Sequence, residues 1–305
     1  MRARGPCESN RGVYAAGIRH HRIARSAAAA PALAGLFVST CTLDGPGLSI
    51  PWAEPHLVVR FGPKAHGGLD LHVMGARQRA RRKMLARGQR VVSARVRLGM
   101  HQAVFGVPAS ALAERIVPLE DLWGDAAERL AERLARAEDV PQAAAMLEEA
   151  IAGRLVTIDE AEAHTRLALD AAARLATARV NEVADTLGVS ERNLRRVFRD
   201  VVGMSPKEFA RLTRFHLALH EARAARDVDW AGVAASTGYY DQAHLIAEFR
   251  DIVGVTPRAL LEELRGGELD LGRPREHGRR APEPAARVTR GRRRRCTRHR
   301  RRRRR

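Results

Sequence analysis

The order of hydrophobic and polar residues changes character about one third of the way along the chain. Before Gly99, apolar and polar residues alternate over short segments such as 92–98, a period typical of a half-buried strand. Residues 56–61 and 69–73 have a similar character and are bounded by Gly or Pro, so we expect two more short strands there. After Gly99 the apolar residues lie three and four positions apart, which predicts helices.

The expected elements suggest an α+β fold with a β-rich domain at 36–155 and an all-α domain at 160–265. Residues 1–35 show no sustained period, and we expect a disordered leader in which His20 and His21 are solvated. Residues 266–305 are rich in Arg and are expected to form a disordered tail. The helices are predicted at 108–116, 122–134 and 141–155, with helical character continuing from 158 to about 175.

A repeat lies inside the last third of the chain. Residues 197–206 read VFRDVVGMSP and residues 248–257 read EFRDIVGVTP, so that Phe198 and Phe249 are 51 positions apart. Upstream, Gly188 and Gly238 are 50 positions apart. One residue has therefore been inserted between the glycine and the phenylalanine of the second copy.

Each copy has the spacing of a helix-turn-helix. In the first copy Ala184 is small where two helices cross, and Gly188 can adopt the left-handed conformation of a tight turn. Ser190 is a natural N-cap for the second helix, on which Leu194 and Phe198 would face the core. Residues 206–226 contain no internal Gly or Pro and predict one long connecting helix.

This layout resembles the AraC/XylS family of transcription regulators over residues 165–261. The matching positions in the second copy are Gly238, Tyr239, Asp241, Gln242, Leu245, Phe249, Gly254, Val255, Thr256 and Pro257. The resemblance implies helix-turn-helix units at about 180–199 and 230–250, joined by a rigid helix at about 206–226, with recognition helices in successive major grooves. Where family members often have Ser-Tyr-Phe, this chain has Ala243-His244-Leu245.

The resemblance also assigns roles to individual residues. Base reading would fall to Arg192, Asn193, Arg195 and Arg196 of the first recognition helix, and to Gln242, Ala243, His244 and Ala247 of the second. Phosphate contacts would come from Ser190, Arg199 and Arg250. The motif itself would be held by Ala184, Gly188, Leu194, Phe198, Gly203, Pro206, Ala234, Gly238, Leu245, Phe249, Gly254 and Pro257. The alternative for the charged residues is that they only solvate exposed helix faces.

The front domain carries a weaker resemblance. Residues 106–124 are similar to the segment that closes a cupin-like sensing domain in one branch of the same family, which implies a small-molecule effector. Trp52, which follows a proline, is most simply a core residue, with a place in a pocket wall as the alternative. The basic stretch 76–90 predicts a polar strand face and loop, with binding of an anionic effector or of the DNA backbone as the alternative. His56, His66, His72 and His101 are isolated in the sequence, so we expect no metal and no other cofactor.

Charge alone gives a different picture. Lys and Arg total 54 against 35 Asp and Glu, a formal net charge of +19. Residues 266–305 hold 17 Arg and 4 acids, so +13 of that charge belongs to the tail. Residues 180–260 hold 11 basic and 11 acidic residues and are formally neutral. The overall charge therefore predicts nucleic-acid binding by the tail, whereas the repeat predicts nucleic-acid binding by a specific motif.

We therefore predict a cytoplasmic, sequence-specific DNA-binding transcription regulator, acting as an activator or as a repressor. Double-stranded DNA is the expected partner, with RNA polymerase, a small-molecule effector and a second copy of the chain as further candidates, and no membrane. Cys7, Cys41 and Cys296 have no CxxC spacing, which fits a reducing compartment. The chain has no GxSxG, no HExxH and no phosphate-cradling glycine loop, so we expect no enzyme. The rival hypotheses are a cupin-type enzyme with an accessory helical domain and a nonspecific nucleic-acid binder acting through the tail.

Overall fold

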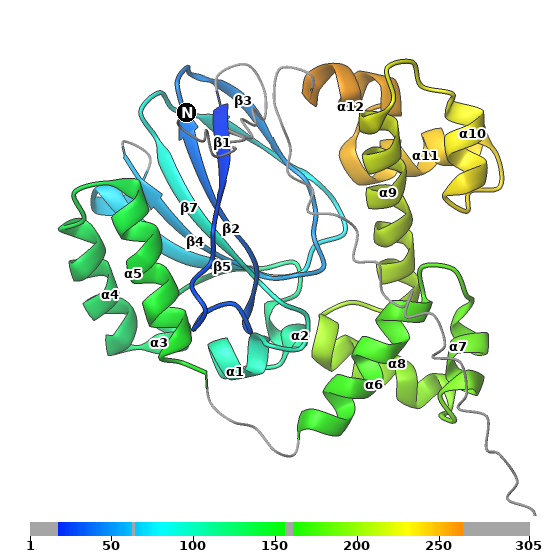
Figure 1. Ribbon diagram of the computed structural model, residues 1–305, viewed down its shortest axis with the longest axis horizontal. Coiled ribbons are helices and arrows are strands. Elements are labelled where there is room, and N and C mark those ends of the chain that lie inside the picture. The colour runs from blue at the N-terminus through cyan, green and yellow to red at the C-terminus, as the bar shows by residue number, and fades with distance from the viewer. Residues whose placement is uncertain (1–17, 63–64, 156–160, 265–305) are drawn as a thin grey trace, which may run out of the picture. The chain divides into compact units, whose positions relative to one another are not determined.

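The computed structural model describes residues 18–62, 65–155 and 161–264, and it has a β-rich part followed by a helical part (Figure 1). The predicted α+β fold is confirmed. By their contacts, all of the described residues belong to one unit. The expected tail at 266–305 and residues 1–17 of the expected leader lie outside the described residues.

Eight strands make up two antiparallel sheets in the described β-rich part. Six of them form one sheet in the order β1-β2-β7-β4-β5-β8, and β3 pairs with β6 in the other. The predicted strands at 56–61, 69–73 and 92–98 correspond to β4, β5 and β7. The bounds are β1 (Ile18–Ile23), β2 (Leu33–Cys41), β3 (Gly45–Ser49), β4 (His56–Phe61), β5 (Leu69–Met74), β6 (Arg81–Leu85), β7 (Arg90–Val96) and β8 (Ile116–Pro118).

The larger sheet buries one face against two helices. Successive side chains of a strand point to opposite faces, so Leu57 and Val59 of β4 share a face, while Val58 lies on the other. Leu57 and Val59 pack in one hydrophobic core with Leu134 of α4 (Asp125–Ala135) and Leu147 of α5 (Val140–Ala152). Figure 1 shows α4 and α5 beside the sheet. The remaining helical segments of this part are η1 (His66–Gly68), α1 (His101–Phe105), α2 (Ala109–Leu112) and α3 (Glu120–Trp123).

The helical part is arranged around its longest helix, α9 (Pro206–Ala224). This helix begins at a capping box in which Ser205 Oγ accepts from the backbone N–H of Glu208, while the Glu208 carboxylate accepts from the backbone N–H of Ser205. The predicted connecting helix is confirmed. The other helices are α6 (Ala161–Arg174), α7 (Val180–Thr186), α8 (Glu191–Val202), α10 (Trp230–Ser236), α11 (Gln242–Val253) and α12 (Pro257–Leu264).

Aromatic residues of α9 join the two halves of the helical part. The ring of Phe209 lies 5.3 Å from that of Phe198 on α8, and the ring of Phe215 lies 4.8 Å from that of Phe249 on α11. Three of these four residues, Phe198, Phe215 and Phe249, are fully buried. The two phenylalanines that mark the sequence repeat therefore pack on the same helix.

The predicted leader at 1–35 is wrong for its described residues. Residues 18–23 form the edge strand β1, paired with β2 from Ile18 opposite Cys41 to Ile23 opposite Leu36. His20 is only 7% exposed, stacks on Phe37 and lies 2.7 Å from Ser39 Oγ through its Nδ1 atom, so it is not solvated as predicted. The strand was missed because a histidine occupies the inward position where the alternation rule expects an apolar residue.

Two of the expected helices are interrupted. The one predicted at 108–116 stops after Leu112, because Glu114 has a positive φ of 57° and Ile116 then pairs with Met74 in the sheet. The helix predicted at 122–134 is divided at Gly124, whose φ is 53°. In both places the helical spacing of apolar residues is kept, but a left-handed backbone conformation turns the chain.

We expect Phe215→Ala to lower the free energy of unfolding by about 3–5 kcal/mol, because it removes a fully buried ring and leaves a cavity. His220→Ala on the exposed side of the same helix is the matched control and should change stability by no more than about 0.5 kcal/mol. Urea unfolding followed by circular dichroism measures both. Equal effects of the two substitutions would show that the α9 core does not depend on Phe215.

Candidate nucleic-acid interface and cavity

The first helix-turn-helix consists of α7, a tight turn and α8. Gly188 has a φ of 66°, which a residue with a side chain rarely adopts, and Ala184 is buried where the helices meet. Ser190 Oγ accepts from the backbone N–H of Asn193 at 3.2 Å and so caps α8. Leu194 and Phe198 are buried, as the spacing predicted.

The arginines of α8 lie on its outer face. Arg192, Arg195 and Arg196 are exposed, and Arg199 is exposed near the end of the helix. Arg195 pairs with Glu191 one turn earlier, and Arg196 Nη2 donates to Asn193 Oδ1 at 3.0 Å. These local contacts hold the arginine side chains on the outer face of α8. This face is charged, and no other described part of the chain covers it.

The second helix-turn-helix, α10 and α11, repeats this construction. Gly238 has a φ of 80°, and Ala234 is buried at the crossing of the two helices. Asp241 Oδ1 accepts from the backbone N–H of His244 at 2.7 Å and caps α11, as Ser190 caps α8. Leu245 and Phe249 are buried. The predicted base-reading residues Gln242, Ala243, His244 and Ala247 all lie on the exposed side of α11.

The outer surface of α11 carries less positive charge than that of α8. Arg211, which extends from α9, pairs with both Glu248 and Asp251 of α11. The hydrogen bonds to these acids raise the pKa of Arg211 against the effect of its partial burial. Arg250 is exposed near the C-terminal end of the helix, and α11 has no other arginine. The two recognition helices therefore present different electrostatic surfaces.

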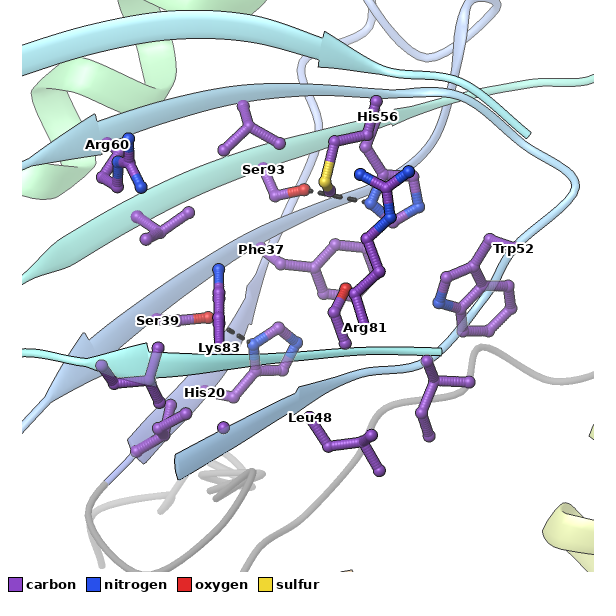
Figure 2. A pocket seen from close by; sticks show the side chains of 18 of the residues that line it. His20, Phe37, Ser39, Leu48, Trp52, His56, Arg60, Arg81, Lys83 and Ser93 are labelled. Carbon is purple, nitrogen blue, oxygen red and sulfur yellow. Dashed lines mark hydrogen bonds between the residues drawn. The ribbon is translucent and has the colours of Figure 1, made fainter. Parts of the chain in front are cut away.

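A cavity of about 300 Å³ lies in the β-rich part (Figure 2). One wall is the face of the six-stranded sheet opposite to α4 and α5, and the other comes from β3 and β6. Trp52 lines it, which is the alternative that the sequence left open for this residue. Other lining side chains are His20, Phe37, Ser39, Leu48, His56, Val58, Arg60, His72, Met74, Arg77, Lys83, Ser93 and Arg95.

The ionisable lining of the cavity is strongly basic. Arg60, Arg77, Arg81, Arg82, Lys83 and Arg95 line it, whereas none of the lining residues is an Asp or a Glu. Among the described residues, Arg60 pairs with Asp70 and Arg82 with Glu263, but no carboxylate lies within ion-pair distance of Lys83. Partial desolvation by the surrounding protein lowers the pKa of Lys83, and the nearby Arg60 lowers it further. Burial likewise lowers the pKa of Arg77 to about 10.

Trp52 forms the centre of a cluster at the end of the cavity. Its ring stacks on His216 of α9 at 4.2 Å, and the Arg95 guanidinium lies 4.4 Å above it. His216 Nε2 donates to the carbonyl oxygen of Pro51 at 2.9 Å. Burial lowers the pKa of His216 to about 4, because nothing nearby stabilises the imidazolium ion strongly enough to offset its lost hydration.

The second sheet also contacts the helical part. Arg82 of β6 makes two hydrogen bonds to the carboxylate of Glu263 on α12, of 2.8 and 2.9 Å. Just before β6, the backbone N–H of Ala80 donates to the carbonyl oxygen of Ile252 at 2.8 Å, and Arg79 pairs with Asp251 at 2.7 Å. The basic stretch 76–90, predicted to be a polar strand face and loop, thus contacts both the cavity and the end of α11.

The sequence predicted the two helix-turn-helix units but not most of the cavity. His20, Lys83 and Arg95 are distant in the sequence and meet only because β1, β6 and β7 come together in space. The period-two alternation of β7 could have placed Arg95 and Ser93 on one face, but it could not show what that face covers. Within the described ranges, no three His, Cys, Asp or Glu side chains are grouped so that they could hold a metal ion. No described helix is long and apolar enough to span a membrane.

Residues 183–263 match the family described as a helix-turn-helix domain, and the match includes both copies of the repeat. No curated protein matches the chain. The chain is similar to solved structures of ToxT from Vibrio cholerae. For the structure at 1.65 Å resolution, the TM-score is 0.41 with 8% identity over 82% of this chain and 99% of that chain. For unsaturated fatty acid bound wild-type ToxT from strain SCE256, it is 0.39 with 10% identity over 73% of this chain and 94% of that chain.

We expect the stability of the protein to fall as the pH drops from about 6.5 toward 4. The folded-state pKa of His216, about 4, lies below its ordinary value of 6.5, so in this interval the unfolded chain binds more protons. His216→Gln should therefore reduce the slope of unfolding free energy against pH by up to about 1.4 kcal/mol per unit. Parallel slopes for the wild type and the variant in urea unfolding would contradict this assignment.

Proposed function

We propose that this protein, whose residues 183–263 are an AraC-type helix-turn-helix domain, is a sequence-specific DNA-binding transcription regulator controlled by a small-molecule effector. The observation that carries the proposal is the paired construction of α7–α8 and α10–α11. Each unit has a left-handed glycine in its turn, a side-chain cap on its second helix and an outer helix face that no described residue covers. Both second helices pack on α9, which holds them apart.

The exposed residues of α8 and α11 are suited to reading base edges. Arg192, Arg195 and Arg196 can pair with guanine through two parallel hydrogen bonds. On α11, Gln242 suits adenine, and the methyl groups of Ala243 and Ala247 suit the thymine methyl. Asn193 and His244 complete the two sets, although each also has a local hydrogen bond, to Arg196 and to the Tyr240 backbone respectively.

Phosphate contacts require groups near the edges of the recognition helices. Arg199 and Arg250 occupy equivalent places in the repeat, 51 positions apart, and both are exposed. Ser190 uses an oxygen lone pair to cap α8, which leaves its hydroxyl proton available for a phosphate oxygen. These residues would position the protein on DNA without reading its sequence.

The effector is best placed in the basic cavity. Its sheet wall and Trp52 offer apolar surface, and Lys83 offers a positive charge that no described carboxylate neutralises. An anionic group on an otherwise apolar small molecule complements this lining. A regulator of this kind catalyses no reaction, whereas a cupin-type enzyme would need stoichiometric metal and turnover.

The strand β6 offers a path from the cavity to the DNA-binding helices. Lys83 lines the cavity, and the neighbouring Arg82 holds Glu263 of α12. An effector that moves Lys83 would therefore strain the contact of Arg82 with α12 and the contact of Ala80 with the end of α11. This is the differential contact that an effector needs in order to shift the equilibrium between two states.

The compartment, the polymerase and the oligomeric state follow from the same regulatory role. We place the regulator in the cytoplasm, where it would act on transcription by RNA polymerase. A homodimer would select two copies of a half-site at a fixed spacing, and a monomer would select one.

We expect the full chain to enrich a defined site from a random DNA pool. A chain lacking residues 266–305 should enrich the same site with a weaker salt dependence, because 17 Arg have been removed. If the shortened chain binds all sequences alike, then the tail is responsible and the protein is a nonspecific nucleic-acid binder.

On the selected site, Arg196→Ala should weaken binding roughly 10-fold and relax the preference at one base pair. Arg199→Ala should weaken binding to all sequences and lower the slope of log K against log salt by about 1. Arg258→Ala removes an equal charge from the exposed side of α12 and is the control. If Arg258→Ala matches the other two variants, net charge and not position decides affinity.

We expect carboxylates with an apolar body to raise the Tm of the protein, and their neutral amides not to. At a hundredfold excess over Kd the rise should be about 5–10 °C. Lys83→Met should abolish the rise, whereas Met84→Ala, on the same strand but with an exposed side chain, should retain it. A rise that persists in Lys83→Met would place the anionic group elsewhere.

A further inference from the structure

The second helix-turn-helix unit is one residue longer than the first, and the structure identifies the additional residue. The turn glycines Gly188 and Gly238 are 50 positions apart, whereas the caps Ser190 and Asp241 are 51 positions apart. In the first unit Val189 alone separates the glycine from the cap. In the second, Tyr239 takes the inward position of Val189, since it is 5% exposed and packs in the same core. The additional residue is therefore Tyr240.

Tyr240 does not contribute to the fold through its side chain. It is 91% exposed, whereas the other exposed large hydrophobic residues of the described chain lie between 50% and 60%. Its backbone is held, because its N–H faces His244 Nδ1 at 3.4 Å and Asp241 follows as the cap of α11. Tyrosine rings normally contribute large contact areas, and their hydroxyl groups find hydrogen-bond partners. A fixed backbone that presents an uncovered tyrosine is suited to an external partner.

The position of Tyr240 relates it to DNA. It lies two residues before Gln242, the first residue of α11, and recognition helices contact base edges through their N-terminal residues. Residues 240–244 form one continuous exposed run. Any DNA that reaches Gln242 and Ala243 must therefore pass close to Tyr240.

The charge of α11 explains why a tyrosine would be useful there. The helix has Arg250 near its C-terminal end and no cation in its first two turns, whereas α8 carries four arginines. The acids Glu248 and Asp251 are already paired with Arg211. A phosphate beside the beginning of α11 would need a neutral donor, and tyrosine hydroxyl groups are among the side-chain groups that contact phosphates.

We propose that the Tyr240 hydroxyl donates a hydrogen bond to a DNA phosphate at the edge of the groove that α11 enters, and so positions the second recognition helix. This inference rests on the proposed DNA-binding function. Because tyrosine is neutral, the contact adds affinity without releasing counterions, which distinguishes it from the contacts of Arg199 and Arg250.

The test uses the full chain and the duplex that the wild type enriches from a random pool. Tyr240→Phe should weaken binding about 10- to 100-fold, the effect of one lost hydrogen bond to a charged acceptor, with the salt slope and the preferred sequence unchanged. Tyr240→Ala should weaken it at least as much. Leu43→Ala, an exposed residue of the β-rich part, should bind as the wild type does. Thermal unfolding of each variant checks that the fold is retained.

Wild-type affinity of Tyr240→Phe would overturn the inference, whether or not Tyr240→Ala binds weakly, since the hydroxyl would then not contact DNA. The inference also fails if Tyr240→Ala binds normally but loses control of transcription, which would assign the ring to a protein partner. If the wild type enriches no site at all, the proposed function fails, and this inference fails with it. Enrichment by the wild type with no effect of Tyr240→Phe overturns this inference alone.

Discussion

The core along α9 is the constraint on which both DNA-binding units depend. Phe209 and Phe215 lie six residues apart on this helix and pack against Phe198 of α8 and Phe249 of α11 respectively. Because these contacts are buried and close-packed, neither recognition helix can rotate without opening a cavity in the shared core. The repeat in the sequence thus encodes two equivalent phenylalanines, Phe198 and Phe249, that pack against one central helix. The spacing between the outer faces of α8 and α11 is a consequence of that packing.

The strand β6 links this helical core to the β-rich part. Lys83 and Arg82 of this strand both line the cavity, and Arg82 also holds Glu263 of α12, so β6 contacts both the cavity and the helical part. Trp52 makes a second link, since it lines the cavity and stacks on His216 of α9. Leu48, Ile50 and Ala76 of the β-rich part also belong to the same buried hydrophobic core as the helices.

Local patterns were sufficient to predict the helical part and the central strands. Glycines with positive φ, capping residues and buried positions three and four apart act within a few residues, and Gly188, Ser190 and Leu194 all lie where the sequence placed them. The edge strand β1 and the cavity could not be predicted in this way. His20 is buried because Phe37 and Ser39 on another strand receive it, and Lys83 lines a cavity because β3 and β6 cover the sheet. These are long-range events, and a single sequence carries little local signal for them.

The charge of the protein takes on a different meaning once the two recognition helices are compared. A formal charge of +19 suggests that attraction to phosphate is spread over the molecule, but residues 180–260 are neutral as a whole. Within them, α8 concentrates arginine on its outer face, whereas the acids of α11 are occupied by Arg211 from α9. The first unit is thus equipped to supply electrostatic affinity, and the second to add directional contacts of neutral groups. Of the two units, the first would therefore lose more affinity with added salt, while the second would continue to discriminate between sequences.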